Sequence, residues 1–399
     1  MPRIPLTRRR VAALAALATI AAVVAGTTSA AAAPSPTEVG TWGASTDRTG
    51  AAVNDQTVRD IVHTNIGGSG LRVALSNVFG SQAVTFGHVS VGVRQSGADV
   101  VPGTNQQVTF SGSPSVKVPA GAEVLSDPLP GDVAPQQDLA VSIYVQGAAG
   151  TVTGHNFTAA TSYLSGAGDH AGEEAGAAFA TTISNWYWLE GLVVSEQRAS
   201  STVVAFGDSI TDGVGSTRDT NQRWPDDLAR RLLAGPPAHQ MGVVDEGISG
   251  NKILTDGAGV SALARLDRDV LAQPGARTVI LLEGINDLSG GATADQVIAG
   301  QRQLIARVHA AGKCIVGATL TPFGNSSDTE KAAVRTVNDF IRNSGEFDGV
   351  ADFNKAVRDP ADPDRMLPIY DSGDSLHPSN AGYVVMADSV NLKQLDCSR

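Results

Sequence analysis

TVVAFGDSITDG, residues 202–213, places an apolar run directly before a glycine, an aspartate and a serine. The segment Val203–Phe206 has the length and composition of a strand that is buried on both faces. Ser209 follows where such a strand would leave its sheet, so we expect its hydroxyl at the strand's carboxyl end. Serine and aspartate also form ordinary turns, so the meaning of this motif depends on the rest of the chain.

Downstream of this motif, apolar runs of strand length alternate with helical patterns. The sequence predicts strands at Val243-Val244, Thr278–Leu282 and Ile315–Ala318, and helices at Trp224–Leu233, from Thr293 to Gly312 and over about 329–342. A last helix is predicted to begin near Pro378, because proline suits the first turn of a helix. This alternation is typical of a parallel sheet that is covered by helices on both faces. We therefore assign residues 199–399 to an α/β domain.

The preceding region, residues 38–198, has a different texture, with many glycines, prolines and β-branched residues. Apolar and polar residues alternate in its short runs, which include Leu71–Leu75, Val89–Val93 and Leu139–Val145. Short alternating runs between turn residues predict an antiparallel β-sandwich.

The first 33 residues have the three parts of a secretory signal. Arg3 and Arg8–Arg10 are positive, Val11–Gly26 is apolar, and Ala31–Ala33 supplies small residues for cleavage. A membrane anchor is the alternative, but the apolar run is shorter than the ~20 residues that a span needs. We expect a secreted, extracellular protein with no membrane anchor once the signal has been removed.

The formal net charge is −11, and removal of the four arginines of the signal takes it to −15. Such a charge repels nucleic acid, which we therefore do not expect as a partner. The two cysteines are Cys314, at the start of a predicted strand, and Cys397, in the C-terminal tail. In an exported protein they can pair in a disulfide, and the alternative is a buried apolar side chain and a loose thiol.

Asp374-Ser375-Leu376-His377 lies just before the last predicted helix. An aspartate three residues before a histidine can accept a hydrogen bond from the histidine Nδ1–H, which leaves Nε2 to take a proton from a serine. The alternatives are a loop-capping aspartate beside a surface histidine, or a metal pair. A metal site needs further ligands, and the remaining histidines show no matching spacing. We expect no metal and no cofactor.

Two further residues follow predicted strands. Asn286, after the strand that ends at Leu282, can direct its side-chain NH₂ at an oxyanion. Gly250 can bring its backbone N–H close to a ligand because it has no Cβ. An Asn-Asp turn and a flexible loop glycine are the alternatives. Together with Ser209, Asp374 and His377, however, these residues fill the roles that a serine hydrolase needs.

Over residues 202–395 the chain resembles the SGNH, or GDSL-type, hydrolases. The segments similar to family blocks are Gly207-Asp208-Ser209, Ser249-Gly250-Asn251, Gly284-Ile285-Asn286-Asp287 and Asp374-Ser375-Leu376-His377. The resemblance implies a flavodoxin-like three-layer fold, with Ser209 as nucleophile, His377 as base and Asp374 as its orienting carboxylate. It also implies an oxyanion hole made by Ser209, Gly250 and Asn286.

These observations predict a secreted serine esterase that acts through an acyl-enzyme on short-acyl, aryl or carbohydrate esters. Its expected partner is a small-molecule or polysaccharide ester. The alternatives are a lipase or phospholipase for longer acyl chains, and a non-catalytic carbohydrate-binding protein. The aromatic run Asn185–Trp188 can stack on a sugar or aryl group, or it can seal the interface between the two domains.

Overall fold

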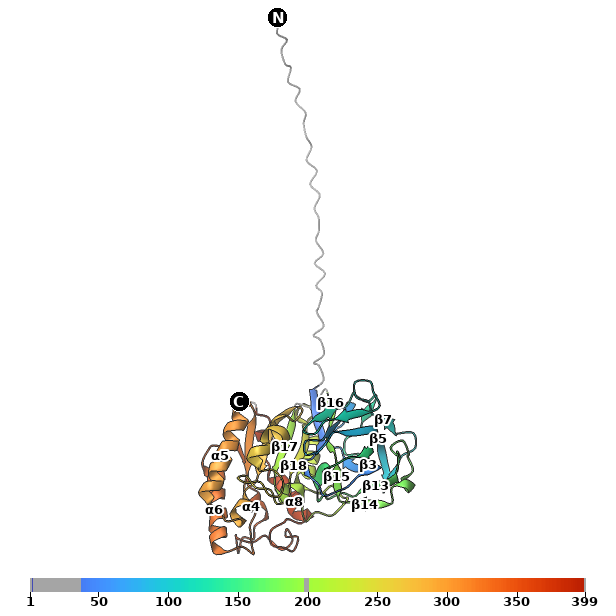
Figure 1. Cartoon of the computed structure of the whole chain (residues 1–399). Coiled ribbons are helices and arrows are strands. Elements are labelled where there is room, and N and C mark those ends of the chain that lie inside the picture. The colour runs from blue at the N-terminus through green and yellow to red at the C-terminus, as the bar shows by residue number, and fades with distance from the viewer. Residues whose placement is uncertain (1, 3–36, 197–200, 398–399) are drawn as a thin grey trace. The chain divides into compact units, whose positions relative to one another are not determined.

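Two architectures follow one another along the chain, as a computed structural model shows (Figure 1). The structure describes Pro2, residues 37–196 and residues 201–397. Residues 36–399 belong to one compact unit. The predicted secretory signal, residues 1–33, lies outside the described residues apart from Pro2, and so does the boundary predicted between residues 198 and 199.

Parallel strands form the sheet of the C-terminal part. They are β17 (Thr202–Gly207), β18 (Gly242–Gly247), β19 (Ala276–Leu282), β20 (Cys314–Ala318) and β21 (Gly349–Ala351). Their order is β18-β17-β19-β20-β21, and every residue of β17 is buried. The predicted parallel sheet is thus confirmed. Its order is flavodoxin-like, which places the topological switch point between β17 and β19.

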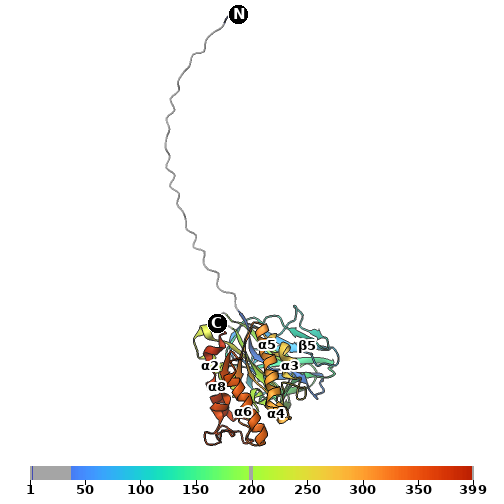
Figure 2. The ribbon, with the colours of Figure 1, turned by 90° about the vertical axis from the view of Figure 1, so that its left-hand side faces the viewer.

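Helices cover both faces of this sheet (Figure 2). On one face α2 (Trp224–Leu233) packs against α8 (Asn380–Ser389), and on the other α5 (Ala294–Ala310) packs against α6 (Asp328–Asn343). The side chain of Thr293 caps α5 by accepting a hydrogen bond from the Gln296 N–H, as its sequence predicts. The shorter helical elements are α1 (Ser209–Asp212), α3 (Ala262–Leu266), α4 (Ile285–Ser289), α7 (Phe353–Val357), the π-helical η3 (Asp267–Leu271), and the 3₁₀ turns η1 (Gly176–Ala178), η2 (Pro237–His239) and η4 (Leu392–Leu395).

The start of the last helix differs from the prediction. Helix α8 begins at Asn380, because the Ser379 side chain accepts a hydrogen bond from the Gly382 N–H and so acts as the N-cap. Pro378 precedes this cap and forms a β-bridge with Asp371. The proline therefore shapes the loop that carries His377 rather than the first turn of the helix.

The N-terminal part is antiparallel, as predicted. One sheet has the order β1-β16-β4-β10, with β9 on β4, and a second has the order β14-β13-β3-β11-β5-β6, with β7 and β8 on β5. A third, small sheet has the order β15-β12-β2. The strands are β1 (Thr37–Gly43), β2 (Asp47–Arg48), β3 (Asn54–His63), β4 (Gly68–Ser76), β5 (Val84–Ser96), β6 (Asp99–Val100), β7 (Gln106–Gln107), β8 (Val116–Val118), β9 (Glu123–Leu125), β10 (Asp132–Val133), β11 (Asp138–Ala148), β12 (Thr153–Asn156), β13 (Ser162–Ala167), β14 (Thr181–Ile183), β15 (Asn185–Tyr187) and β16 (Leu189–Glu196).

The two larger sheets of this N-terminal domain share one hydrophobic core. The aromatic run Trp186–Trp188, which begins in β15 and ends just before β16, belongs to it, because all three residues are buried. The ring of Trp186 packs edge-on against Trp42, with 4.9 Å between centroids. These side chains therefore build the interior of the domain and offer no exposed platform for a sugar ring.

The last residues of the described chain are fastened to the sheet. A disulfide joins Cys314, the first residue of β20, to Cys397 across 83 positions of sequence. The disulfide thereby connects the C-terminal tail covalently to the α/β domain. No helix among the described residues has the length and apolar composition needed to cross a bilayer.

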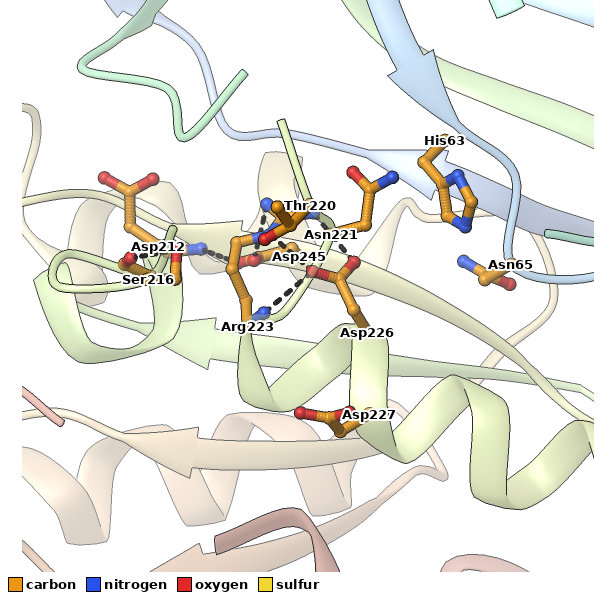
Figure 3. A network of polar contacts seen from close by, with 12 residues as sticks. His63, Asn65, Asp212, Ser216, Thr220, Asn221, Arg223, Asp226, Asp227 and Asp245 are labelled. Carbon is orange, nitrogen blue, oxygen red and sulfur yellow. Dashed lines mark hydrogen bonds and ion pairs between the residues drawn. The ribbon is translucent and has the colours of Figure 1, made fainter. Parts of the chain in front are cut away.

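The N-terminal domain lies against β18, the outermost strand of the parallel sheet. Ala44, which follows β1, forms a parallel bridge with Asp245, and the Asn65 side chain exchanges two hydrogen bonds with the backbone of Val243. Figure 3 shows Arg223, at the start of α2, between Asp226 of that helix and Asp245 of β18, with ion-pair distances of 2.9 and 3.0 Å. The strand is thus held by both domains.

Candidate active site

Ser209 is the first residue of α1 and lies directly beyond the carboxyl end of β17. The Asp208 side chain caps this short helix by accepting a hydrogen bond from the Ile210 N–H at 3.0 Å. Gly207 makes the tight exit possible, because a Cβ there would lie 2.4 Å from the Leu282 carbonyl oxygen. The serine residue is 7% exposed and is therefore buried.

The structure brings Ser209, His377 and Asp374 together. The Ser209 hydroxyl lies 2.9 Å from His377 Nε2, and His377 Nδ1 lies 2.5 Å from Asp374 Oδ2. A carboxylate only accepts hydrogen bonds, so Nδ1 donates to it and Nε2 presents its lone pair to the serine. This is the arrangement in which an imidazole removes a proton from a hydroxyl.

Asp374 is also held by the backbone of its own loop. Its Oδ1 accepts hydrogen bonds from the N–H groups of Leu376 and His377, at 2.9 and 2.8 Å. Partial burial raises the pKa of Asp374, but the hydrogen bonds from the His377 side chain and from both backbone N–H groups outweigh it, so the pKa falls below its ordinary value. The carboxylate therefore remains charged and keeps the imidazole oriented.

Gly250 lies in the turn that follows β18, and Asn286 lies in the first turn of α4, which follows β19; these two strands are the neighbours of β17. Gly250 has a φ of +81°, a left-handed conformation that glycine adopts without strain. One N–H of the Asn286 amide donates to the Asn251 carbonyl at 2.9 Å. The amide nitrogen carries two hydrogens, so the second remains for a ligand. Asp287 of α4 also bonds the segment that follows Gly250, because its carboxylate accepts a hydrogen bond from the Ile253 N–H at 2.8 Å.

With this geometry in view, comparisons with known proteins identify the C-terminal part. Residues 205–385 match the model of the GDSL-like lipase/acylhydrolase family. This segment is a GDSL-type carboxylic ester hydrolase domain. None of the curated proteins matches the chain.

Several solved structures are similar to the GDSL domain. An acetylxylan esterase from Geobacillus stearothermophilus is 24% identical, covering 49% of this chain and 94% of its own, with a TM-score of 0.38. A carbohydrate acetylesterase from Sinorhizobium meliloti is 16% identical, covering 47% and 94%, with a TM-score of 0.38. A member of the lipolytic G-D-S-L family from Veillonella parvula is 17% identical, covering 47% and 94%, with a TM-score of 0.36.

Beneath the site of the GDSL domain lies a buried arginine that the sequence motifs do not reveal. Arg265 donates to the carbonyls of Gly207 and Glu246, at 2.9 and 2.7 Å, and to Asn251 Oδ1 at 3.0 Å. It thereby joins the ends of β17 and β18 to the loop that follows Gly250. In the sequence, the role of Arg265 is indicated only by the presence of a charged residue among the apolar residues of α3.

A pocket of about 130 Å³ opens beside the GDSL domain's Ser249-Gly250 turn. Phe157 forms part of its wall from the N-terminal domain and is 75% exposed. The backbone of Phe157 has a φ of +63°, which is strained for an aromatic residue. The other residues around the pocket are Ser45, Asp47, Gly154, His155, Asn156, Ile248, Ser249, Gly257, Ala258 and Gly259.

Within residues 37–196 and 201–397, no group of three or more histidine, cysteine, aspartate or glutamate side chains could hold a metal ion. The acidic groups that lie under the site of the GDSL domain are instead buried among protein atoms. Burial raises the pKa of Asp208 to about 7, and the neighbouring carboxylates of Asp287 and Asp212 add to this effect.

Proposed function

We propose that the chain is a secreted serine esterase that hydrolyses its substrate through an acyl-enzyme. The observation that carries this proposal is the 2.9 Å contact between the Ser209 hydroxyl and His377 Nε2, with Asp374 on the opposite ring nitrogen. A non-catalytic carbohydrate-binding protein would have no use for such an aligned set. Secretion rests on the pattern of residues 1–33.

In the first step, the Ser209 oxygen attacks the ester carbonyl while His377 Nε2 takes the hydroxyl proton. The negative charge on the former carbonyl oxygen is stabilised by the N–H groups of Ser209 and Gly250 and by the Asn286 amide. The carbon–oxygen bond to the alcohol then breaks, and the alcohol leaves with the proton from His377.

The second step repeats these roles with water. His377 removes a proton from water as the water oxygen attacks the acyl-enzyme carbonyl. The bond to Ser209 breaks, the serine recovers its proton from His377, and the carboxylic acid is released. The ester, water, Ser209 and His377 together account for every bond and proton in both steps.

The substrates we propose are short-acyl, aryl or carbohydrate esters. The pocket beside Ser249 is lined by neither Ser209 nor His377, and it is smaller than the ~300–1,000 Å³ of sites for drug-sized ligands. We propose that it receives a single ring or a short chain that lies next to the reacting ester. An exposed aromatic face such as that of Phe157 packs well against a ring. Long acyl chains, as in lipase substrates, would need a larger apolar groove.

The first test is hydrolysis of p-nitrophenyl acetate by the parent and by Ser209→Ala. We expect the variant to lose turnover while it retains its fold, because it lacks the attacking oxygen. Ser389→Ala is the matched control, since the Ser389 hydroxyl donates a hydrogen bond to the Met386 carbonyl within α8. If Ser209→Ala hydrolyses the ester at the parent rate, the proposal is wrong. A series of esters of increasing acyl length then separates esterase from lipase.

A further inference from the structure

The N-terminal domain places one histidine close to the GDSL site. His155 lies on β12, is 3% exposed, and packs on the Trp186 ring with 5.5 Å between centroids. Its Nδ1 lies 2.7 Å from the Ser45 carbonyl oxygen, and its Nε2 lies 3.0 Å from Asp212 Oδ1. The sequence motifs assign no role to this residue.

The partners of His155 determine its charge. The Ser45 carbonyl accepts hydrogen bonds, and an ionised Asp212 only accepts them, so with Asp212 ionised both ring nitrogens carry a hydrogen and the ring is an imidazolium. Burial lowers the pKa of His155, but the charge of Asp212 and its hydrogen bond outweigh burial, and the net pKa lies above the ordinary value. The geometry and the electrostatics therefore agree on a buried cation.

Asp212 transmits this contact toward the reaction centre. Its Oδ2 accepts hydrogen bonds from both the backbone N–H and the hydroxyl of Ser249, the former at 3.1 Å. Asp212 ends the helix that Ser209 begins, and Ser249 directly precedes Gly250. One carboxylate thus connects the turn that holds the nucleophile to the turn that holds the proposed oxyanion donor.

We propose that His155 is a positioning residue for ester hydrolysis, which holds the Gly250 N–H at its working distance from Ser209 through Asp212 and Ser249. This inference rests on the proposed function. Without the imidazolium, the buried Asp212 carboxylate would lose its cationic partner and would move toward water. This movement weakens its two bonds to Ser249, and a displaced Gly250 N–H stabilises the transition state less.

A purely structural role for His155 would be to fasten the two domains together. That role predicts a loss of stability with unchanged catalysis in the molecules that remain folded. The positioning role predicts instead a fall in kcat with little change in KM, because the Gly250 N–H acts on the charge that develops in the transition state.

The experiment compares the parent with His155→Gln, Ser249→Ala and the double variant, using purified full chain and p-nitrophenyl acetate. We expect each single variant to lower kcat by about tenfold to a hundredfold, with KM within about twofold. Because both variants act on the same connection, the double variant should be no slower than about threefold below the slower single variant. Binding of a boronic acid that forms a tetrahedral adduct with serine should weaken in parallel with kcat.

Asn65→Ala is the control for domain attachment, since Asn65 bonds the Val243 backbone near the start of β18, whereas Ser249 follows the end of that strand. It should lower the unfolding midpoint and leave kcat within about twofold of the parent. A kcat of His155→Gln within twofold of the parent would overturn the inference, as would a double variant whose losses multiply. If His155→Gln does not fold, Ser249→Ala alone decides, because an unchanged kcat there removes the proposed connection. Failure of the proposed function itself would appear differently, as a parent enzyme no faster than Ser209→Ala.

Discussion

Replacement of Asn286 by alanine tests whether its side chain donates to the oxyanion or only bonds the Asn251 backbone. The amide donates one hydrogen to the Asn251 carbonyl at 2.9 Å, and the proposed mechanism assigns its second hydrogen to the oxyanion. Loss of an oxyanion donor costs about 3 kcal/mol of transition-state stabilisation, and each 1.4 kcal/mol is roughly tenfold in rate. We therefore expect kcat to fall by about a hundredfold. Loss of the bond to Asn251 should lower the free energy of unfolding by only about 1 kcal/mol.

Steady-state kinetics on p-nitrophenyl acetate and urea denaturation measure the two effects independently. KM should change little, because the donor acts on charge that is absent from the bound ester. Asn65→Ala removes another buried asparagine that bonds the backbone, at the opposite end of β18, and serves as the matched control. If Asn286→Ala loses the expected stability but less than threefold in kcat, the side chain merely joins the two loops and is no oxyanion donor.

Four further outcomes follow from the structure. Asp374→Ala should lower kcat by roughly 10²–10⁴-fold, because His377 loses the group that fixes its tautomer; steady-state rates at neutral pH measure this. Phe157→Ala should raise KM for phenyl acetate, whose ring can pack on the exposed Phe157 ring, and leave KM for ethyl acetate unchanged; an equal effect on both substrates would remove Phe157 from the binding site. Burial, with two neighbouring carboxylates, raises the pKa of Glu190 to about 8 from an ordinary value of 4.5. The folded chain therefore binds this proton more tightly than the unfolded chain, and the associated stability is lost as pH rises from about 4.5 to about 8. The Tm of Glu190→Gln should equal that of the parent at pH 5 and should exceed it by about 3 °C or more at pH 9. Equal Tm values at pH 9 would contradict this. Replacement of both Cys314 and Cys397 by serine should lower the free energy of unfolding by about 2–4 kcal/mol, since the disulfide closes a loop of 83 positions. A urea midpoint equal to that of the parent would contradict this expectation.

The sheet and the cluster of Ser209, His377 and Asp374 side chains could be predicted from the sequence because their signals are local. Strands β17 and β19 are buried on both faces, and this burial leaves continuous apolar runs such as Val203–Phe206. Asp374 and His377 are three positions apart, so one loop suffices to bring their side chains together. The start of α8 was misplaced because two helix-start signals, Pro378 and Ser379, are adjacent, and the serine side chain prevails.

The residues that support the site could not be found in this way. His155 meets Asp212 across 57 positions, and Arg265 reaches Ser45 across 220. Neither pair has a spacing that distinguishes it from chance, since the contacts depend on how the N-terminal domain packs against β18. Asn65 is similarly inconspicuous in sequence, although it bonds the Val243 backbone.

The way Ala44 and Asn65 occupy the backbone of β18 limits how the chain can be shortened. A fragment that began near residue 201 would leave an outer strand with unsatisfied N–H and C=O groups along one side. An exposed edge strand of this kind can pair with strands of other molecules and favours aggregation. The hydrolase segment is therefore poorly suited to expression on its own, and a useful truncation would have to retain the residues of the N-terminal domain that cover β18.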